Sequence, residues 1–352
     1  MALEFDLINR YFAPLSQGSK VIDIGIGDDG AVLNVPQNHQ LVVVTDTLVS
    51  GVHFPVETSA YDIAWKALAV NLSDLAAMGA TPACYSLALT LPDYREQWLA
   101  DFAAGLRALN ELFSIPLIGG DTTKGPLTIT ITAQGWVPNQ QAILRSGAQV
   151  GDCVCVTNTL GEGALGLKLA LNDWPAKFLE QELSTTEKQQ ALNGLNRPMP
   201  QLAISADLRG LVSSAIDISD GLLADLGHVL QQSNARLARE GGEKNQNEIS
   251  ASIQHSVLGA DIELTQLPLS SGVARYVEQT NDWSLPLSGG DDYQLCLTLK
   301  KENYPALKAR LNAKGVCLTA IGSIVLQEGI QCLKQGVVQE GRGGEKIGYC
   351  HF

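Results

Sequence analysis

The stretch AIDISDGLLADLGHVL, residues 215–230, places a short apolar strand, an acidic turn and an amphipathic helix in immediate succession. Its apolar residues Leu222, Leu226 and Leu230 recur at helical spacing. The same order of apolar run, glycine-bearing turn and helix appears in CVCVTNTLGEGALGL, residues 153–167. Strands that alternate with helices in both halves of the chain indicate two α/β (α+β) domains rather than one doubly wound sheet.

The first half of the chain repeats this alternation of strands and helices. The run LVVV, residues 41–44, predicts a buried strand that ends at Thr45 and Asp46, and residues 62–78 carry apolar side chains at helical spacing. LIGGD, residues 117–121, predicts a short strand followed by a tight turn. The threonines of residues 128–132 alternate with isoleucines, which is typical of a strand with one polar face.

Length and composition predict two domains. A chain of 352 residues exceeds what a single hydrophobic core usually spans. The glycine-rich, charged segment RSGAQVGD, residues 145–152, separates two apolar strands, so we expect an N-terminal domain over residues 1–148 and a C-terminal one over 149–352. Residues 233–258 are polar without a sustained period, and we expect a mobile surface excursion there.

The charge balance limits the partners of this chain. It has 24 Lys and Arg against 37 Asp and Glu, a net charge of −13, which disfavours nucleic acid and anionic membranes as partners. The N-terminal segment is acidic and lacks the basic start and apolar core of a signal peptide, and no segment reaches membrane-spanning length without charges. We therefore expect a cytosolic protein.

Acidic residues recur where apolar runs meet glycine-bearing turns. Carboxylates that gather at one site raise each other's pKa unless a cation neutralises them, and carboxylate oxygens suit Mg²⁺, which in turn binds nucleotide phosphates. Asp is also a favoured helix cap and turn former, so any single one of these residues has a purely structural explanation, as for Asp28, Asp220 and Asp292. The whole set favours a shared metal site: Asp29, Asp46, Asp74, Asp121, Asp217.

Two common nucleotide-binding loops are excluded. GIGDDG, residues 25–30, matches Gly-x-Gly-x-x-Gly in form, but the chain continues as extended AVLNVP, and two carboxylates stand where a pyrophosphate would bind. The sequence also lacks a Gly-x-x-x-x-Gly-Lys-Ser/Thr loop. His53, in SGVHF, is either a substrate contact or a packed residue, while Arg145 and Lys124 are either nucleotide contacts or solvated surface.

Motifs spread over nearly the whole chain resemble those of the thiamine-monophosphate kinase family, within the superfamily of aminoimidazole-ribonucleotide synthetase and selenophosphate synthetase. In chain order they are GIGDDGAVL, VTDTLVSGVHF, KALAVNLSDLAAMGA, LIGGDTTKGPLTIT, RSGAQVGD, SAIDISDGLLADLGH and SGGDDYQLCLT. The chain departs from the family pattern at Val44, where Ser is usual, and at Asp291, where Glu is usual.

The resemblance implies ATP-dependent phosphorylation of thiamine monophosphate to thiamine diphosphate by a homodimer whose N-terminal domains pair. It implies several Mg²⁺ ions, with ATP as co-substrate and K⁺ as a further candidate. The implied Mg²⁺ ligands are Asp29, Val44 (through its carbonyl), Thr45, Asp46, Asp74, Asp121, Asp217 and Asp220. The implied ATP contacts are Gly120, Asp121, Arg145 and Ser219, and the implied substrate contacts are His53, Asp291 and Tyr349.

Two other functions stay open at this level. Another ATP-using enzyme of the same superfamily would act on a different substrate, such as a formylglycinamidine compound. A non-catalytic nucleotide-binding dimer would bind Mg-ATP without turnover. The chain lacks a Ser or Cys nucleophile flanked by a plausible base, so we expect direct transfer without a phosphorylated enzyme.

Overall fold

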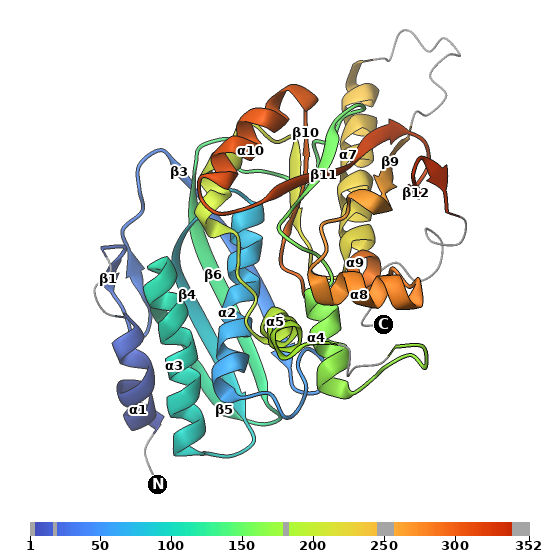
Figure 1. Cartoon of the computed structure of the whole chain (residues 1–352). Helices are drawn as coiled ribbons and strands as arrows, with labels where there is room; N and C mark the ends of the chain where they lie inside the picture. The colour runs from blue at the N-terminus through green and yellow to red at the C-terminus, as the bar shows by residue number, and fades with distance from the viewer. Residues whose placement is uncertain (1–3, 17–19, 179–182, 245–256, 340–352) are drawn as a thin grey trace. The chain divides into compact units, whose positions relative to one another are not determined.

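The computed structural model describes residues 4–16, 20–178, 183–244 and 257–339 (Figure 1). The chain divides into two compact units, one of Met1–Ala142 with Asn196–Ser205 and one of Ile143–Leu195 with Ala206–Phe352. The segment Asn196–Ser205 joins the first unit although it follows residues of the second, and no sequence signal marks it. Arg197 contributes to its attachment, because the guanidinium lies over the Tyr61 ring and pairs with Asp62.

The first unit contains a four-stranded sheet with the strand order β3-β6-β4-β5, and a separate ribbon of β1 and β2. β4 and β5 run parallel, whereas β6 is antiparallel to both of its neighbours. Its helices and strands are α1 (Glu4–Leu7), β1 (Ile22–Ile24), β2 (Val32–Leu33), β3 (His39–Val49), α2 (Ala60–Ala77), β4 (Thr81–Leu91), α3 (Glu96–Phe113), β5 (Leu117–Lys124) and β6 (Thr128–Pro138).

Helices α2 and α3 lie side by side over one face of this sheet (Figure 1). Gly105 of α3 allows their close approach, because a Cβ there would lie 2.4 Å from the Tyr61 carbonyl oxygen. The strand residues beneath the helices are buried, as Leu48 and Ile131 show. On the opposite face, Leu41 and Val43 are 50% and 54% exposed.

The second unit contains a seven-stranded sheet with the strand order β13-β12-β9-β11-β7-β10-β8. Its elements are β7 (Cys153–Thr157), α4 (Glu162–Leu171), α5 (Thr185–Asn196), α6 (Ser205–Leu208), β8 (Ser214–Asp217), α7 (Leu222–Lys244), β9 (Leu258–Glu263), α8 (Ser271–Thr280), α9 (Ser284–Ser288), β10 (Leu295–Leu299), α10 (Tyr304–Asn312), β11 (Leu318–Leu326), β12 (Ile330–Lys334) and β13 (Val337–Val338).

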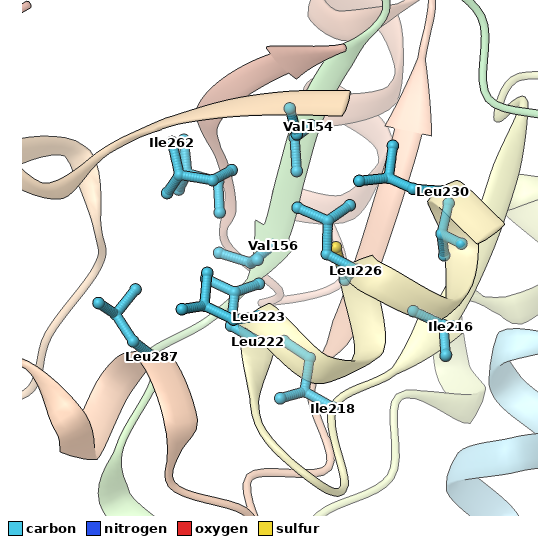
Figure 2. Packing of buried hydrophobic residues seen from close by; sticks show 14 of the residues in the cluster. Val154, Val156, Ile216, Ile218, Leu222, Leu223, Leu226, Leu230, Ile262 and Leu287 are labelled. Atoms are coloured by element: carbon cyan, nitrogen blue, oxygen red, sulfur yellow. The ribbon is translucent and has the colours of Figure 1, made fainter. Parts of the chain in front are cut away.

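Helix α7 packs its apolar stripe against the strands of this second sheet. Figure 2 shows Leu222, Leu226 and Leu230 of α7 gathered with Val156 of β7 and Ile216 of β8 in one buried cluster. Burial of these side chains stabilises the junction of β8 and α7, since each fully buried Leu or Ile contributes about 1.5–3 kcal/mol. The turn between β8 and α7 therefore joins two well-packed elements.

Three local predictions are wrong. Asp46 lies inside β3, which continues to Val49, and Asp121 lies inside β5, so neither residue occupies a turn. Both strands continue because β3 pairs with β6 along its full length and β5 pairs with β4. Residues 233–244 continue helix α7 instead of forming an excursion. Residues 235–240 are strong helix formers, and Arg236 pairs with Glu240 one turn later at 2.7 Å. Residues 245–256 lie outside the described part of the chain.

Among the described helices, none has the length and apolar character needed to cross a membrane.

Candidate functional site

The acidic side chains of the first unit are divided between the two faces of its sheet. Side chains alternate along a strand, so Asp46 lies on the same face of β3 as the buried Leu48, the face that α2 covers. Asp74 lies in the last turns of α2 and is half-buried, as is Asp46. The structure thus places Asp46 and Asp74 on elements that pack together.

Thr45 and Asp121 lie on the opposite face. The Thr45 hydroxyl is 3.0 Å from that of Thr132 on β6. Across the sheet, Asp121 of β5 pairs with Ala88 of β4, Ala88 pairs with Thr130 of β6, and Thr130 pairs with Thr47 of β3. Paired residues point to the same face, so Asp121 shares the face of Thr47 and Thr45. β3 and β5 are the two edges of the sheet, three strand spacings or roughly 14 Å apart.

Gly120 and the turn at Asp29 have local structural roles. A Cβ at position 120 would lie 1.8 Å from the Leu87 carbonyl oxygen, so only glycine fits there. In the turn, the Asp28 carboxylate accepts the amide of Asp29 at 2.8 Å, and Asp29 itself is exposed. Asp28 thus acts as a turn former.

His53 lies in a turn that follows β3. Its Nδ1 accepts the Val49 amide at 3.0 Å, and its own amide donates to the Val49 carbonyl at 3.0 Å. The Lys66 ammonium, from α2, donates to the His53 carbonyl at 3.0 Å, and Lys66 is only 2% exposed. Because Nδ1 accepts a hydrogen bond, the neutral His53 ring carries its proton on Nε2.

The turn after β8 is held by one carboxylate of α7. Asp225 Oδ2 accepts the backbone amides of Ser219, Asp220 and Gly221 at 3.0, 3.1 and 3.2 Å. Burial, followed by the nearby charges of Asp217 and Asp220, raises the pKa of Asp225 to about 8. The turn therefore presents Ser219 and Asp220 with a fixed backbone.

A second loop of this unit, residues 288–293, hydrogen-bonds to that turn. Its Asp291 and Tyr293 amides donate to the Ser219 and Ile218 carbonyls at 2.9 and 2.8 Å. Asp292 is buried, and its oxygens accept the Gly161 amide at 2.7 Å and the Gly163 amide at 3.3 Å at the start of α4. Burial raises the pKa of Asp292 to about 7. Asp292 therefore fixes the loop to α4.

Arg145 is exposed in a segment that α7 anchors. Ser233 of α7 is only 2% exposed, and its hydroxyl accepts the Gly147 and Ala148 amides at 3.1 Å each. The same hydroxyl donates to the Arg145 carbonyl at 3.4 Å. The Arg145 backbone is therefore restrained while its guanidinium remains accessible. The predicted substrate contact Tyr349 lies outside the described residues.

The donor chemistry of the predicted ligands fits Mg²⁺, because carboxylate, hydroxyl and carbonyl oxygens are its usual ligands. Within the described ranges, however, no three His, Cys, Asp or Glu side chains gather closely enough to enclose a metal. Mg²⁺ is usually held by one or two carboxylates together with substrate phosphates, rather than by a closed protein cage. The residues present therefore fit Mg²⁺ that binds with a nucleotide.

Sequence reasoning missed three residues that support the candidate side chains. They are Lys66, Asp225 and Tyr293. A signal existed for Lys66, which is the one charged residue in the apolar run of residues 63–70, in a helix that is buried on most of its surface. Asp225 and Tyr293 carried no such signal, because their hydrogen bonds to residues 219–221 and to Asp291 depend on the conformation of the turn and the loop, which the sequence pattern does not report.

Comparison with known proteins defines first the class and then the family. Residues 27–137 match the model for the N-terminal domain of AIR synthase related proteins. The thiamine-monophosphate kinase of Escherichia coli strain K12 is 41% identical over 337 residues, which cover 95% of this chain and 94% of that protein.

Solved structures agree with the sequence relatives. The crystal structure of thiamine-monophosphate kinase from Stenotrophomonas maltophilia K279a superimposes with a TM-score of 0.80 at 40% identity, over 96% of this chain and 98% of that one. A structure of AaThiL complexed with AMPPCP and TMP gives a TM-score of 0.69 at 28% identity, over 97% and 96% of the two chains. The chain belongs to the thiamine-monophosphate kinase family.

Proposed function

We propose that this protein transfers the γ-phosphoryl group of ATP to the phosphate of thiamine monophosphate, with release of thiamine diphosphate and ADP. The observation that carries the proposal is the 41% identity to a thiamine-monophosphate kinase over 95% of the chain. The similarity of this chain to AaThiL, whose structure was solved in complex with AMPPCP and TMP, supports ATP and thiamine monophosphate as the two substrates.

The acceptor chemistry favours direct transfer. The phosphate of thiamine monophosphate is ionised near neutral pH, so its oxygen attacks without a strong general base. The task of the protein is then to align the two phosphates and to offset their negative charge. In an acidic chain this offset requires cations.

Bound Mg²⁺ supplies charge neutralisation on the β- and γ-phosphates. As ligands of the Mg²⁺ ions we propose Asp29, Val44, Thr45, Asp46, Asp74, Asp121, Asp217 and Asp220. K⁺ is a further candidate cofactor. For ATP we propose contacts from Gly120, Asp121, Arg145 and Ser219, among which the exposed Arg145 guanidinium is a natural partner for phosphate oxygens.

His53, Asp291 and Tyr349 are the proposed contacts for thiamine monophosphate. The Val49 amide leaves the proton of the neutral His53 ring on Nε2, so the ring offers a donor to a phosphate oxygen. Asp291 offers a negative charge to the thiazolium ring, which carries a permanent positive charge. These two roles match the two ends of the substrate.

We also propose a homodimer formed through the face of the four-stranded sheet opposite α2. Leu41 and Val43 expose apolar side chains on this face, which favours association with a second copy. Asp46 and Asp121 lie on opposite edge strands, too far apart to bind one ion in a single chain, since Mg²⁺ ligands lie about 2.0–2.1 Å from the metal. Thr45 and Asp121 lie on the proposed face whereas Asp46 lies on the other, so pairing that sets β5 of one copy beside β3 of the other would bring Asp121 near Thr45 of the second copy.

Sedimentation tests the proposed dimer. The wild-type chain should sediment as a dimer and Val43→Lys as a monomer. A monomeric wild type, or a Val43→Lys variant that remains dimeric, would contradict the proposed face.

The cytoplasmic location stays a prediction from the sequence.

A substrate panel with Mg-ATP tests the proposed activity. ADP should form with thiamine monophosphate and not with a formylglycinamidine substrate. Turnover of the latter alone would favour another enzyme of the superfamily, and ATP binding without any turnover would favour a nucleotide-binding dimer.

Amide variants test the proposed metal ligands. Asp46→Asn, Asp74→Asn and Asp121→Asn should each keep the fold and lose most turnover, because an amide binds hard cations weakly. Near-wild-type rates for all three at ordinary Mg²⁺ would contradict the ligand set.

A further inference from the structure

The loop of residues 288–293 holds two non-glycine residues in a rarely adopted backbone conformation. Asp291 has φ of 66° and Tyr293 has φ of 48°, both in the left-handed region. A bulky aromatic residue is rarely found there, and such strain persists only where surrounding contacts impose it. The strain therefore points to a loop whose shape is imposed from outside.

The contacts that impose this shape come from both sides of the loop. The amides of Asp291 and Tyr293 donate to the carbonyls of Ser219 and Ile218, at 2.9 and 2.8 Å. Between them, the buried Asp292 carboxylate accepts two amides at the start of α4. The alternation of these contacts sends the side chain of Asp292 into the unit and leaves Asp291 half-buried.

Within this fixed loop, the side chains of Asp291 and Tyr293 are joined. The Tyr293 hydroxyl donates to Asp291 Oδ1 at 2.9 Å, and Tyr293 is only 9% exposed. Asp291 has two rotatable side-chain bonds, so one hydrogen bond from a packed phenol restricts the direction of its carboxylate. A hydrogen bond to an ionised acceptor is also among the stronger kinds in proteins.

We propose that Tyr293 is a positioning residue that sets substrate affinity by holding the Asp291 carboxylate toward the cationic ring of thiamine monophosphate. This inference rests on the proposed function, in which Asp291 contacts that ring. The neutral phenol hydroxyl leaves the negative charge of Asp291 intact while it fixes its place. Tyr293 thus pre-organises a counter-charge, which lowers the ordering required on binding.

The test is Tyr293→Phe, which keeps the ring in its packed place and removes only the hydroxyl. The KM for thiamine monophosphate should rise about tenfold, equivalent to the ~1.4 kcal/mol of one hydrogen bond, with kcat and the KM for ATP within about twofold of wild type. A matched control is Tyr276→Phe, because the Tyr276 hydroxyl also donates to a carboxylate, that of Asp282, at 2.9 Å. This control should leave both KM values unchanged.

A double-mutant cycle distinguishes positioning from a general loss of structure. In an Asp291→Asn background, Tyr293→Phe should cause less than a twofold further change in the KM for thiamine monophosphate. Full additivity of the two changes, an unchanged KM in Tyr293→Phe, or an equal rise in the KM for ATP would overturn the proposal. If wild-type protein itself fails to turn over thiamine monophosphate, the proposed function fails, which is a separate outcome.

Discussion

Replacement of Asp225 by Ala should destabilise the second unit more than most single substitutions. One oxygen of Asp225 accepts three consecutive backbone amides, those of Ser219, Asp220 and Gly221. Alanine leaves all three donors without this acceptor, and each buried donor left unpaired costs about 1–3 kcal/mol. Asp225 is only 2% exposed, so water does not simply take the place of its carboxylate.

The surroundings of the three amides set the expected size of the loss. Gly221 is buried, whereas Ser219 and Asp220 are half-buried, so water recovers part of the cost at the latter two. The sum is then about 3–5 kcal/mol rather than the upper limit of about 9 kcal/mol. For a unit of this size, 3 kcal/mol lowers Tm by about 6–12 °C.

Thermal unfolding at neutral pH, followed by circular dichroism, measures this loss. Asp225→Asn should lose much less, because its amide oxygen still accepts hydrogen bonds. Asp261→Ala is a matched control, since Asp261 accepts a side-chain donor, that of Gln327 at 2.9 Å, and should cost only about 1 kcal/mol. A Tm for Asp225→Ala within 2 °C of the Asp261→Ala value would refute the reasoning.

Three further predictions concern buried charges. Asp292 has a folded-state pKa near 7, above its unfolded value, so the stability of the wild type should fall relative to Asp292→Asn as the pH rises from about 4 to 7. Parallel curves of Tm against pH for the two proteins would contradict this. The Ser184 amide lowers the pKa of Glu187 to about 2, so Glu187→Gln should lower the free energy of unfolding by about 1 kcal/mol at pH 7. This difference should disappear as the pH falls from about 4.5 towards 2. A difference that does not depend on pH would exclude the carboxylate as its cause. Lys66→Met should raise the KM for thiamine monophosphate about tenfold in steady-state assays, because the His53 turn loses its ammonium contact, and an effect confined to the KM for ATP would argue against this role.

Local sequence patterns predicted which segments are strands and helices, but not how the strands are arranged. Helix α2 was predicted at 62–78 and is found at Ala60–Ala77, because its apolar spacing is a local property. Asp46 and Asp121 were expected near each other, yet they lie on the two edges of one sheet. Strand order depends on contacts between distant segments, which periodicity within a segment does not report.

The candidate site shows the same limit at the level of single residues. From the sequence alone, the acidic pattern directed attention to Asp217, and the family resemblance directed it to Asp220 and Asp291. The roles of Asp225 and Tyr293 became apparent only from hydrogen bonds within the turn after β8 and within the loop of residues 288–293, and from left-handed backbone angles. The turn and loop conformations on which these hydrogen bonds depend have no characteristic local pattern.

The central claim is direct phosphoryl transfer between ATP and thiamine monophosphate, and the most direct test follows the transferred group. ATP labelled on its γ-phosphoryl should be incubated with the protein, Mg²⁺ and thiamine monophosphate, and the products separated. The account predicts label in the terminal phosphoryl of thiamine diphosphate, in equal amount to ADP, and none when Mg²⁺ is chelated. Label recovered as inorganic phosphate, or trapped on the protein, would contradict it.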